Sequence, residues 1–543
     1  MSKATRFLAL LLALAFSGAL LAGCANAPVG AGGEDKELVF TIGTTAELDT
    51  LSPLTTWMMN TMEMIYLVYD SLMRYDENLE PKPSLAKDVQ VSADQLTWTF
   101  TLHDGVKFHD GKPLTSADVQ YTMELMMDTG LGYLYGDALT DIVSIECPDA
   151  KTVVITTGEP VPGIGRLSTP IMPKHILEAI PADALETWAN EAMIGSGPFK
   201  LGSTGDNFVR LERNDDYYGQ KSALDAIVFV TYENADSMAQ AVIIGELDGA
   251  CNLNAAQLAQ LQADKNIEAI AGELPGFEQV AYNCYQDPES GGNPLLLDKI
   301  IRQAIEYGTD KEKIIGMAYG GAGIACESTI VNPSNPGYYN PPEKRLYSPE
   351  KGAALLEANG YVDTDGDGVR EKDGQPLEFR LFVIGDRVNY VKSGQIVAEG
   401  CAELGIKINL ESMDSGLLTD KIYEMDYDMF IWGWGSDNFS GGFGILTTDQ
   451  IGNLNEPGYS NPEYDALVSQ LRTTFDTGAR NALFIELQKI LYEDLPFNVL
   501  IYDSNIQAYR SDRWSGLVQN PKNGGTWFYS GSTFNYLNIK PVS

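Results

Sequence analysis

The sequence predicts an α/β protein, and two observations support this prediction. From about residue 290, apolar segments of strand length alternate with segments whose apolar residues recur at helical spacing. Nearer the start, residues 96–102 alternate apolar with polar side chains, which is typical of a strand with one buried face. Strands that alternate with helices indicate a lobe with a largely parallel sheet.

The first strong strand signal belongs to a predicted hairpin. Residues 96–102 form its first arm, and Asp104 and Gly105 turn the chain. The alternation resumes at Val106 and Phe108, which predicts the second arm.

Helix starts are marked by side chains that can cap free backbone N–H groups. Thr115 is followed three residues later by Asp118, and this capping box predicts a helix to about Met127. Three further helices are predicted to begin after the capping residues Asp298, Asp310 and Ser348. Beyond them, the pattern predicts strands at 377–384, 406–411 and 427–432, and helices at 391–404 and near 416–424.

The amino terminus has the layout of a secretory signal peptide. Lys3 and Arg6 precede an apolar run of about 16 residues, which is shorter than the roughly 20 that span a bilayer. The run ends in Leu-Ala-Gly-Cys at residues 21–24, which resembles a bacterial lipobox. That resemblance implies a signal peptide at 1–23 and a lipid on Cys24, the first mature residue. The alternative is an ordinary signal peptide with a coincidental cysteine.

The segment after Cys24 predicts a tether. Residues 24–36 are small, polar and rich in glycine, which is typical of a flexible linker. We therefore expect the folded body to begin near Glu37 and to be lipid-anchored at the cell membrane, facing the extracellular side or the periplasm.

The charge of the chain excludes one class of partner. The 543 residues carry 37 Lys and Arg against 75 Asp and Glu, a formal net charge of −38. A nucleic-acid-binding protein would show a basic patch, and the acidic balance also disfavours binding to anionic lipids. Besides Cys24 the chain has five widely spaced cysteines, which predict no zinc site and leave one or two disulfides open.

No arrangement of residues typical of an enzyme stands out. The chain has three histidines, and it contains neither a His-Glu-x-x-His zinc motif nor a Gly-x-Ser-x-Gly nucleophile motif. We therefore expect a protein that is not an enzyme and has no cofactor, with a secreted hydrolase as the hypothesis from another class.

Residues 94–119 resemble the signature segment of family 5 extracellular solute-binding proteins. This segment reads Asp-Gln-Leu-Thr-Trp-Thr-Phe-Thr-Leu-His-Asp-Gly-Val-Lys-Phe-His-Asp-Gly-Lys-Pro-Leu-Thr-Ser-Ala-Asp-Val. Shorter matches follow in the family's order, among them 195–201, 213–217, 301–305, 355–361 and 491–496. The members of this family are the peptide, oligopeptide and nickel receptors of ABC importers.

The resemblance implies a two-lobed fold like that of type II periplasmic binding proteins of the large peptide-binding class. Lobe I is expected to comprise 37–284 plus 511–543, with a subdomain inserted at about 80–190. Lobe II is expected at 285–510. Two chain crossings, near Tyr282 and near Tyr509, would form a hinge that closes the lobes around a ligand.

The implied function is that of the membrane-anchored, extracytoplasmic substrate-binding component of an ABC importer. It would act as a monomer, capture short peptides and deliver them to the permease subunits. The alternatives are a non-peptide ligand such as a nickel chelate, an oligosaccharide or an opine-like compound, or a peptide sensor or chaperone outside transport.

The family's peptide-binding positions can be carried over to two loops of lobe II. An aspartate that holds the peptide amine matches Asp437, which Asn438 follows directly. An arginine that holds the carboxylate in dipeptide-type members matches Arg387, whose planar guanidinium suits a carboxylate. The chain departs from the dipeptide-type pattern at 439–443, where Phe-Ser-Gly-Gly-Phe replaces a second Asp-Pro.

Further binding candidates are less tightly tied to a motif. Trp434 and Trp432 are expected to form aromatic walls, or else to belong to the lobe II core. Tyr282 and Asn283 lie on the first crossing strand, which can pair with ligand backbone. Trp57, with Met58 beside it, lies where lobe I often meets ligand.

One acidic loop matches part of a calcium-binding pattern. Asp363, Asp365, Asp367 and Glu371 occupy loop positions 1, 3, 5 and 9, but position 12 is Gly374 instead of a bidentate glutamate. The favoured interpretation is a hairpin turn without a metal, with calcium as the alternative.

Overall fold

The computed structural model describes residues 37–46, 48–135, 139–435, 440, 442–522, 524–528, 531 and 533–542. The predicted signal peptide, Cys24 and the tether to residue 36 lie outside these ranges. From Leu38 onward the chain belongs to a single structural unit. Within the described ranges, none of the helices combines the length and the apolar character that crossing a bilayer requires.

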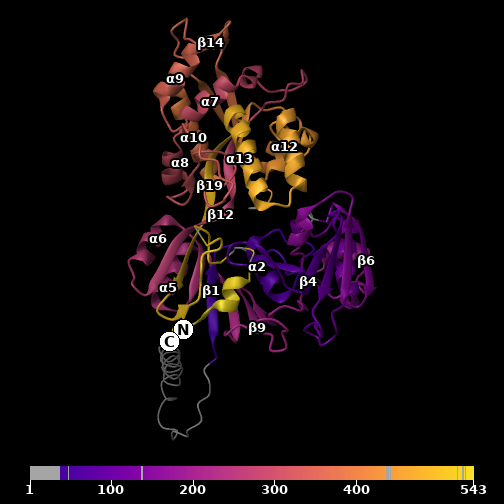
Figure 1. The fold of residues 1–543 in the computed structure, drawn as a ribbon. Coiled ribbons are helices and arrows are strands. Elements are labelled where there is room, and N and C mark those ends of the chain that lie inside the picture. Colours follow the sequence, from indigo (N-terminus) through magenta and orange to yellow (C-terminus); the bar gives the residue numbers. More distant parts are fainter. Residues whose placement is uncertain are drawn as a thin grey trace, which may run out of the picture. The chain divides into compact units, whose positions relative to one another are not determined.

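A mixed sheet runs through this unit (Figure 1), with eleven strands in the described part of the chain. Its strand order is β17 (Lys407–Met413), β16 (Glu378–Ile384), β18 (Met429–Gly435), β12 (Ile267–Tyr282), β19 (Phe497–Arg510), β11 (Gly249–Leu253), β1 (Val39–Thr44), β10 (Ala226–Thr231), β9 (Phe208–Arg213) and β8 (Phe199–Gly205). The short β13 (Ile324–Ala325) pairs with β19 beside this path.

Strands β12 and β19 pass from one hydrophobic core into another. Ile270 of β12 packs against the first core, whereas Phe277 belongs to the second. On β19, Tyr502 belongs to the second core, and Ile506 belongs to a small cluster formed with residues 238–269. The elements around the first core and the small cluster are lobe I, and those around the second core are lobe II.

The crossing between the lobes therefore lies inside these two strands. The sequence prediction puts it near Tyr282 and Tyr509, whereas the core changes between residues 270 and 277 and between 502 and 506. The pairing of β12 with β19 shifts register between Glu273 and Phe277, at the same place. Both strands continue across the boundary, so no turn in the sequence marks it.

Lobe II confirms the predicted alternation of strands and helices. Strand β16 is parallel to both β17 and β18, while β18 is antiparallel to β12. The side chains of Asp298, Asp310 and Ser348 cap three helices as predicted. The helices of this lobe are α7 (Lys299–Tyr307), α8 (Lys311–Ala318), α9 (Pro349–Ala358), α10 (Val388–Glu403), α11 (Ser415–Tyr423), α12 (Pro462–Thr473) and α13 (Thr477–Asp494).

Lobe I carries an inserted subdomain with its own antiparallel sheet. Its strand order is β4 (Ala86–Val91), β5 (Thr97–Leu102), β7 (Thr152–Thr157) and β6 (Ile142–Asp149). Helix α3 (Ser116–Thr129) begins at the predicted capping box of Thr115 and Asp118. The other lobe I helices are α2 (Met59–Val68), α4 (Lys174–Leu177), α5 (Ala235–Ile244), α6 (Ala255–Gln262) and α14 (Phe534–Asn538).

The predicted hairpin after β5 is wrong. Both edges of β5 are occupied, by β4 and by β7, so the chain after Gly105 has no edge to pair with. Val106 and Phe108 are buried, but their backbone bonds close a small local turn: Phe108 N–H donates to Lys112 O, and Leu114 N–H donates to Val106 O. This segment therefore pairs with residues 112–114 through an antiparallel bridge between Lys107 and Pro113, and it does not pair with β5.

The remaining elements are short. They are the strand pairs β2 (Met73–Tyr75) with β3 (Pro81–Pro83), β14 (Glu371–Lys372) with β15 (Gln375–Pro376), and β20 (Trp514–Ser515) with β21 (Lys540–Pro541), and the 3-10 helices η1 (Tyr133–Tyr135), η2 (Pro162–Arg166), η3 (Ala182–Thr187), η4 (Pro294–Leu297), η5 (Phe443–Leu446) and η6 (Thr448–Gln450). The five cysteines of the described body are free thiols, and all except the half-buried Cys147 are buried.

Candidate functional site

The predicted binding loops of lobe II follow two neighbouring strands. Strand β16 ends at Ile384, and Arg387 is the N-cap residue of α10. Strand β18 ends at Gly435, shortly before Asp437 and Asn438. Because β16 and β18 are parallel, their carboxyl ends lie at one edge of the sheet, where α/β lobes commonly bind ligands. Asp437 and Asn438 themselves lie outside the described residues.

Arg387 presents its guanidinium to solvent. Its side chain is exposed and forms no hydrogen bond that caps α10. Within the described ranges no carboxylate forms an ion pair with it. A guanidinium in this position can meet a ligand carboxylate with two parallel hydrogen bonds.

Glu278 lies near Arg387, Asp503 lies near Glu278, and both carboxyl groups have raised pKa values. Burial raises the pKa of Glu278 on β12 to about 8; nearby Asp503 adds to the increase and Arg387 opposes it. Burial likewise raises the pKa of Asp503 on β19 to about 6. The hydroxyl of Tyr319 donates a hydrogen bond to Glu278. Near pH 7, Glu278 is therefore largely neutral and does not repel an anion held by Arg387.

Glycines let these groups approach the sheet closely. A Cβ atom at Gly276 would lie 2.2 Å from Oδ2 of Asp503, and one at Gly433 would lie 3.3 Å from Cγ of Glu278. At Gly435, by contrast, an added Cβ would meet none of the described residues within 4 Å.

Trp432 and Trp434 lie on β18 and are both half-buried. They pair in the sheet with Gln279 and Phe277 and pack against the lobe II core. The indole N–H of Trp434 donates to Oε2 of Glu456 at 3.0 Å. Burial raises the pKa of Glu456 to about 7, and the hydrogen bond from Trp434 opposes this rise. Trp434 is the one nearer the carboxyl end of the strand.

Tyr282 and Asn283 have their polar groups engaged inside lobe II. Asn283 is 2% exposed, and its amide donates to the carbonyl oxygens of Met425 at 3.1 Å and Tyr427 at 2.9 Å. Tyr282 is fully buried, and its hydroxyl donates to Arg302 O at 3.5 Å. The structure does not bring these two residues together with Arg387, because they lie at the other end of the part of β12 that belongs to lobe II.

Trp57 belongs to a short exposed apolar segment of lobe I, residues 57–59. It is 59% exposed, and Met58 and Met59 beside it are also exposed. Its backbone N–H donates to Oδ2 of Asp49 at 2.6 Å, and Asp49 also accepts a hydrogen bond from Thr61 at 2.8 Å. Burial raises the pKa of Asp49, but these hydrogen bonds hold it below its usual value. The ionised carboxylate of Asp49 thus holds the backbone of this exposed segment in place.

Glu278, Asp503 and Glu456 are site candidates that the sequence reasoning missed. Asp503 follows the largely apolar run 497–502, and a charged residue next to such a run was the available signal. The sequence gives no such signal for Glu278 and Glu456, because their spatial neighbours come from other strands and loops.

The Asp/Gly-rich loop brings some of its predicted oxygens together. Carboxylate oxygens of Asp363, Asp365 and Glu371 lie within 4.8 Å of one another in the described residues, and Asp367 is not part of this group. The Asp363 carboxylate accepts N–H groups from two glycines of the loop, at 2.7 and 3.0 Å. These bonds are those of a tight turn, and whether the loop binds calcium stays a prediction.

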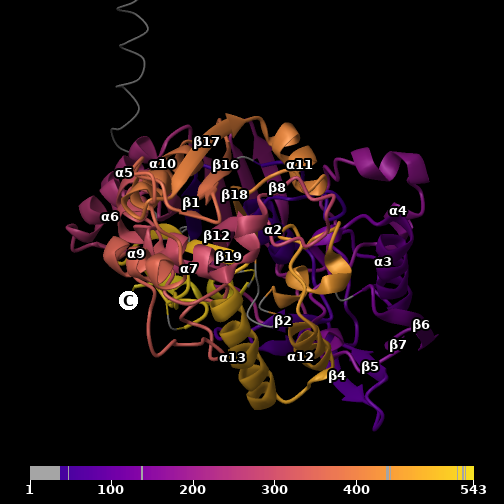
Figure 2. The same cartoon turned by 90° about the horizontal axis from the view of Figure 1, so that it is seen from above.

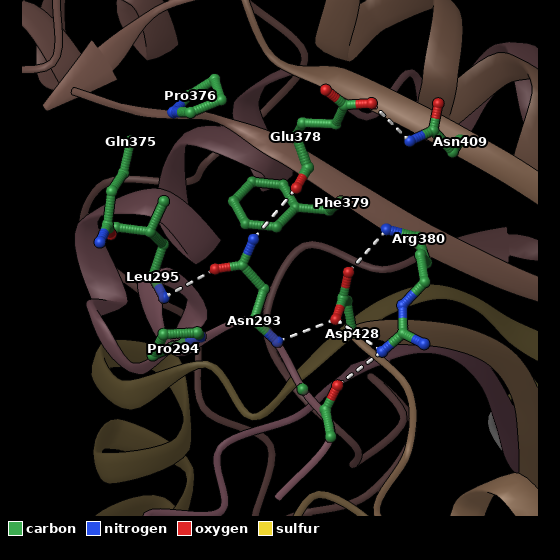
Figure 3. A pocket seen from close by; sticks show the side chains of 12 residues that line it. Asn293, Pro294, Leu295, Gln375, Pro376, Glu378, Phe379, Arg380, Asn409 and Asp428 are labelled. Atoms are coloured by element: carbon green, nitrogen blue, oxygen red, sulfur yellow. Dashed lines mark hydrogen bonds and ion pairs between the residues drawn. The ribbon is translucent and has the colours of Figure 1, made fainter.

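A separate pocket opens at the opposite end of β16 and β18 (Figure 3). Its volume is about 570 Å³, and Asn293, Glu378, Arg380 and Asp428 are among its lining residues. Arg380 forms ion pairs with Asp426 at 3.0 Å and with Asp428 at 3.1 Å, and Asp428 also accepts the N–H of Asn293 at 2.8 Å. Glu378 pairs with Lys407 at 2.7 Å, so each charged side chain that lines this pocket has an opposite charge beside it.

Comparison with known proteins places the chain in a family. Residues 80–451 match the bacterial extracellular solute-binding proteins, family 5 (middle). The oligopeptide-binding protein AppA of Bacillus subtilis (strain 168) is 26% identical over 472 residues, which cover 84% of this chain and 84% of that protein. A putative ABC transporter peptide-binding protein of Brucella ovis is 31% identical over 304 residues, which cover 55% of this chain and 56% of that protein.

Solved structures share the fold. AppA from Bacillus subtilis in complex with a nonapeptide has a TM-score of 0.71 at 24% identity, covering 93% of this chain and 100% of that one. NikZ from Campylobacter jejuni in complex with Ni(L-His) has a TM-score of 0.71 at 23% identity, covering 92% and 99%. HbpA2 from Haemophilus parasuis has a TM-score of 0.78 at 23% identity, covering 93% and 100%. The predicted two-lobed α/β fold of periplasmic-binding-protein type is confirmed, and the chain belongs to family 5 of the bacterial extracellular solute-binding proteins.

Proposed function

We propose that this protein is the substrate-binding component of an ABC importer, which captures short peptides between its lobes and delivers them to the permease subunits. The names of its relatives, an oligopeptide-binding protein and a putative ABC transporter peptide-binding protein, support this proposal. The observation that carries it is the exposed guanidinium of Arg387 at the carboxyl end of β16, which forms no ion pair with a carboxylate of the described residues and lies near the buried Glu278.

The two ends of a peptide need different partners. Its ammonium and its carboxylate both lose water when a cleft closes, so each requires an opposite charge to offset that loss. Arg387 takes the carboxylate, and Asp437, with Asn438 beside it, takes the ammonium. The two loops follow parallel neighbouring strands, which supports their acting on the same ligand.

Aromatic side chains line the remainder of the proposed site. Trp434 supplies a wall next to the ligand, with Trp432 behind it and closer to the core. Trp57 supplies an apolar contact from lobe I. Tyr282 and Asn283 take no part, because their polar groups are already satisfied inside lobe II.

Location and assembly complete the proposal. The family is extracellular, and the lipid on Cys24 holds this member at the outer membrane face as a monomer, next to its permease. Replacing Cys24 with Ser is expected to move the protein from the membrane fraction to the soluble fraction. Protein that stays in the membrane fraction would show that the anchor lies elsewhere.

The test begins with native mass spectrometry of the freshly purified protein. We expect bound masses that match short peptides, and fragmentation then supplies their sequences for synthesis. A bound nickel chelate or sugar would assign the site to the alternative ligands. Recovery of the synthetic peptides uncut after incubation would agree with a receptor, and cleavage products would favour an enzyme.

Arg387→Ala tests the carboxylate anchor. Titration calorimetry is expected to show at least about tenfold weaker binding of a free-acid peptide, because a charge-assisted bidentate contact is lost. The same peptide with an amidated carboxyl end should bind both proteins alike. Lys392→Ala, which removes an exposed cation from the same helix, is the matched control. Equal losses for the acid and the amide would remove Arg387 from the site.

A further inference from the structure

The inserted subdomain touches lobe II through an aromatic pair. Trp98 of β5 stacks on Phe475, with ring centroids 5.9 Å apart and planes 17° apart. Phe475 lies in the turn between α12 and α13 of lobe II, yet it packs against the lobe I core. Figures 1 and 2 both show α12 beside the inserted subdomain. Trp98 is only 6% exposed in this arrangement.

The turn that carries Phe475 is held firmly from lobe II. The guanidinium of Arg480, itself 6% exposed, donates to the carbonyl oxygens of Leu471 at 2.9 Å and Thr474 at 3.0 Å. The side chain of Asp476 caps the start of α13 by accepting the N–H of Ala479 at 2.7 Å. Phe475 therefore moves with lobe II as a rigid projection.

An ion pair lies next to the ring contact. Nη2 of Arg472, in the last turn of α12, lies 3.0 Å from Oδ1 of Asp141, just before β6. It also lies 3.9 Å from Oε1 of Glu159, just after β7. An exposed ion pair adds little energy of its own, but opposite charges at this place favour the approach of the two surfaces.

The inserted subdomain and lobe II are not completely packed against each other around these contacts. A pocket of about 450 Å³ remains between them, lined from the inserted subdomain by Pro81, Trp98 and Arg166 and from lobe II by Phe475 and Phe484, among others. A permanent core would be filled at this position, whereas contacts between domains that move are smaller and less completely packed. The incomplete packing is what an interface that opens and closes requires.

We propose that Trp98, Phe475, Arg472 and Asp141 form an interlobe latch, a contact made when the lobes close and broken when they open. These residues would set the affinity for the ligand without touching it. A contact present only in the closed state raises the closed fraction, and a protein binds its ligand more tightly when more of it is in the competent state. The link to ligand affinity rests on the proposed function, whereas the latch itself does not.

The test measures the opening of the lobes without ligand. Spin labels at Val143→Cys on β6 and Ser469→Cys on α12, both exposed positions, report the distance across the latch by pulsed electron resonance. Cys147→Ser removes the half-buried native thiol. We expect a dominant short-distance population in this background. Phe475→Ala should lower the ratio of short to long distances about two- to tenfold, the range that one aromatic pair provides.

Charge-reversal variants test the latch without removing an aromatic ring from the interface. Arg472→Glu faces Asp141 and Glu159 with like charge and should also shift the population to long distances. Adding Asp141→Lys to Arg472→Glu should restore the short distance, which a general loss of stability would not do. Tyr423→Ala, an exposed aromatic on α11, and Lys489→Glu, an exposed cation whose partner Glu486 is on its own helix, are the matched controls.

The outcomes separate the latch from the proposed function. Unchanged distances in both Phe475→Ala and Arg472→Glu, with unfolding temperatures near that of the parent protein, would overturn the latch. So would the absence of a short-distance population in the parent. A latch that behaves as expected in a protein that binds no peptide would overturn the proposed function alone.

Discussion

Asp437 stands two residues after Gly435, the last residue of β18, and we propose that its carboxylate holds the amino end of the peptide whose carboxyl end Arg387 holds. We expect Asp437→Ala to abolish measurable binding of a peptide with a free amino terminus, because the ammonium would be desolvated without a counter-charge. An N-acetylated peptide, which has no ammonium, should bind Asp437→Ala about as well as it binds the parent protein. Titration calorimetry checks both, with Asp420→Ala, an exposed carboxylate on α11, as the control. Unchanged affinity for the free amine would reject this anchor.

Glu278 gives a pH dependence with a defined sign. Its pKa rises from 4.5 to about 8 on folding, so between these values the folded state binds more protons than the unfolded state. The free energy of unfolding contributed by this group therefore falls as the pH rises through that window. Glu278→Gln removes this loss, and we expect it to raise the free energy of unfolding at pH 8 by about 1–3 kcal/mol while changing little at pH 4.

Urea unfolding at pH 4, 6 and 8 measures this difference. Glu424→Gln, which alters an exposed glutamate on the surface of lobe II, is the control and should follow the parent protein at each pH. A difference between Glu278→Gln and the parent that stays constant from pH 4 to pH 8 would show that folding does not shift the pKa of Glu278.

At the scale of elements, the packing of helices α7, α8 and α13 depends on one buried carboxylate. Glu306, near the end of α7, is 3% exposed and accepts hydrogen bonds from Lys311, at 3.1 Å, and from Arg345. Burial raises its pKa, but the two cations outweigh that effect and hold the pKa below its usual value. Arg345 also lies over the ring of Tyr492 on α13, with its guanidinium carbon 3.6 Å from the ring centroid.

Glu306→Ala would leave two buried cations without their partner. We expect a loss of about 3–5 kcal/mol in the free energy of unfolding, the usual cost of breaking a buried ion pair from one side. Urea unfolding measures it. Glu399→Ala, which removes the exposed partner of Lys313, should change stability little. Comparable losses in both variants would contradict the buried network.

Helix starts were the most predictable part of the fold, because they depend on neighbours in the chain. The caps at Asp298, Asp310 and Ser348 are local, and all three are confirmed. The partner of β5 could not be predicted, because alternation shows which face is buried but not which strand lies alongside.

The candidate site was predictable only where a loop motif carries it. Arg387 lies just after the predicted strand end, and Asp437 and Asn438 lie outside the described residues. Glu278 and Asp503 could not be found from the sequence, because they are on strands separated by more than two hundred residues and their raised pKa values come from tertiary burial.

Both lobes of the whole molecule share β12 and β19, so movement between them has to occur inside paired strands. Residues 274–276 lie in the register shift of β12, where pairing with β19 passes from Glu273 to Phe277. Pro275 has no N–H to donate, and the carbonyl of Leu274 accepts from the amide of Asn332 at 2.7 Å instead of from a strand. This bulge is the place where the strand can bend with the loss of few hydrogen bonds.

We therefore expect hydrogen exchange to locate the hinge at this bulge. The amides of Leu274 and Gly276 should exchange at least about tenfold faster than those of Ala269 and Val280, which lie in regular pairing on either side. Closing the lobes around a bound peptide should slow this exchange while leaving the flanking amides unchanged. The matched comparison is the register shift between Leu201 and Ser203 in β8, which lies within lobe I and should not respond to ligand. Equal protection along the whole of β12, or an equal response at both shifts, would place the movement outside these strands.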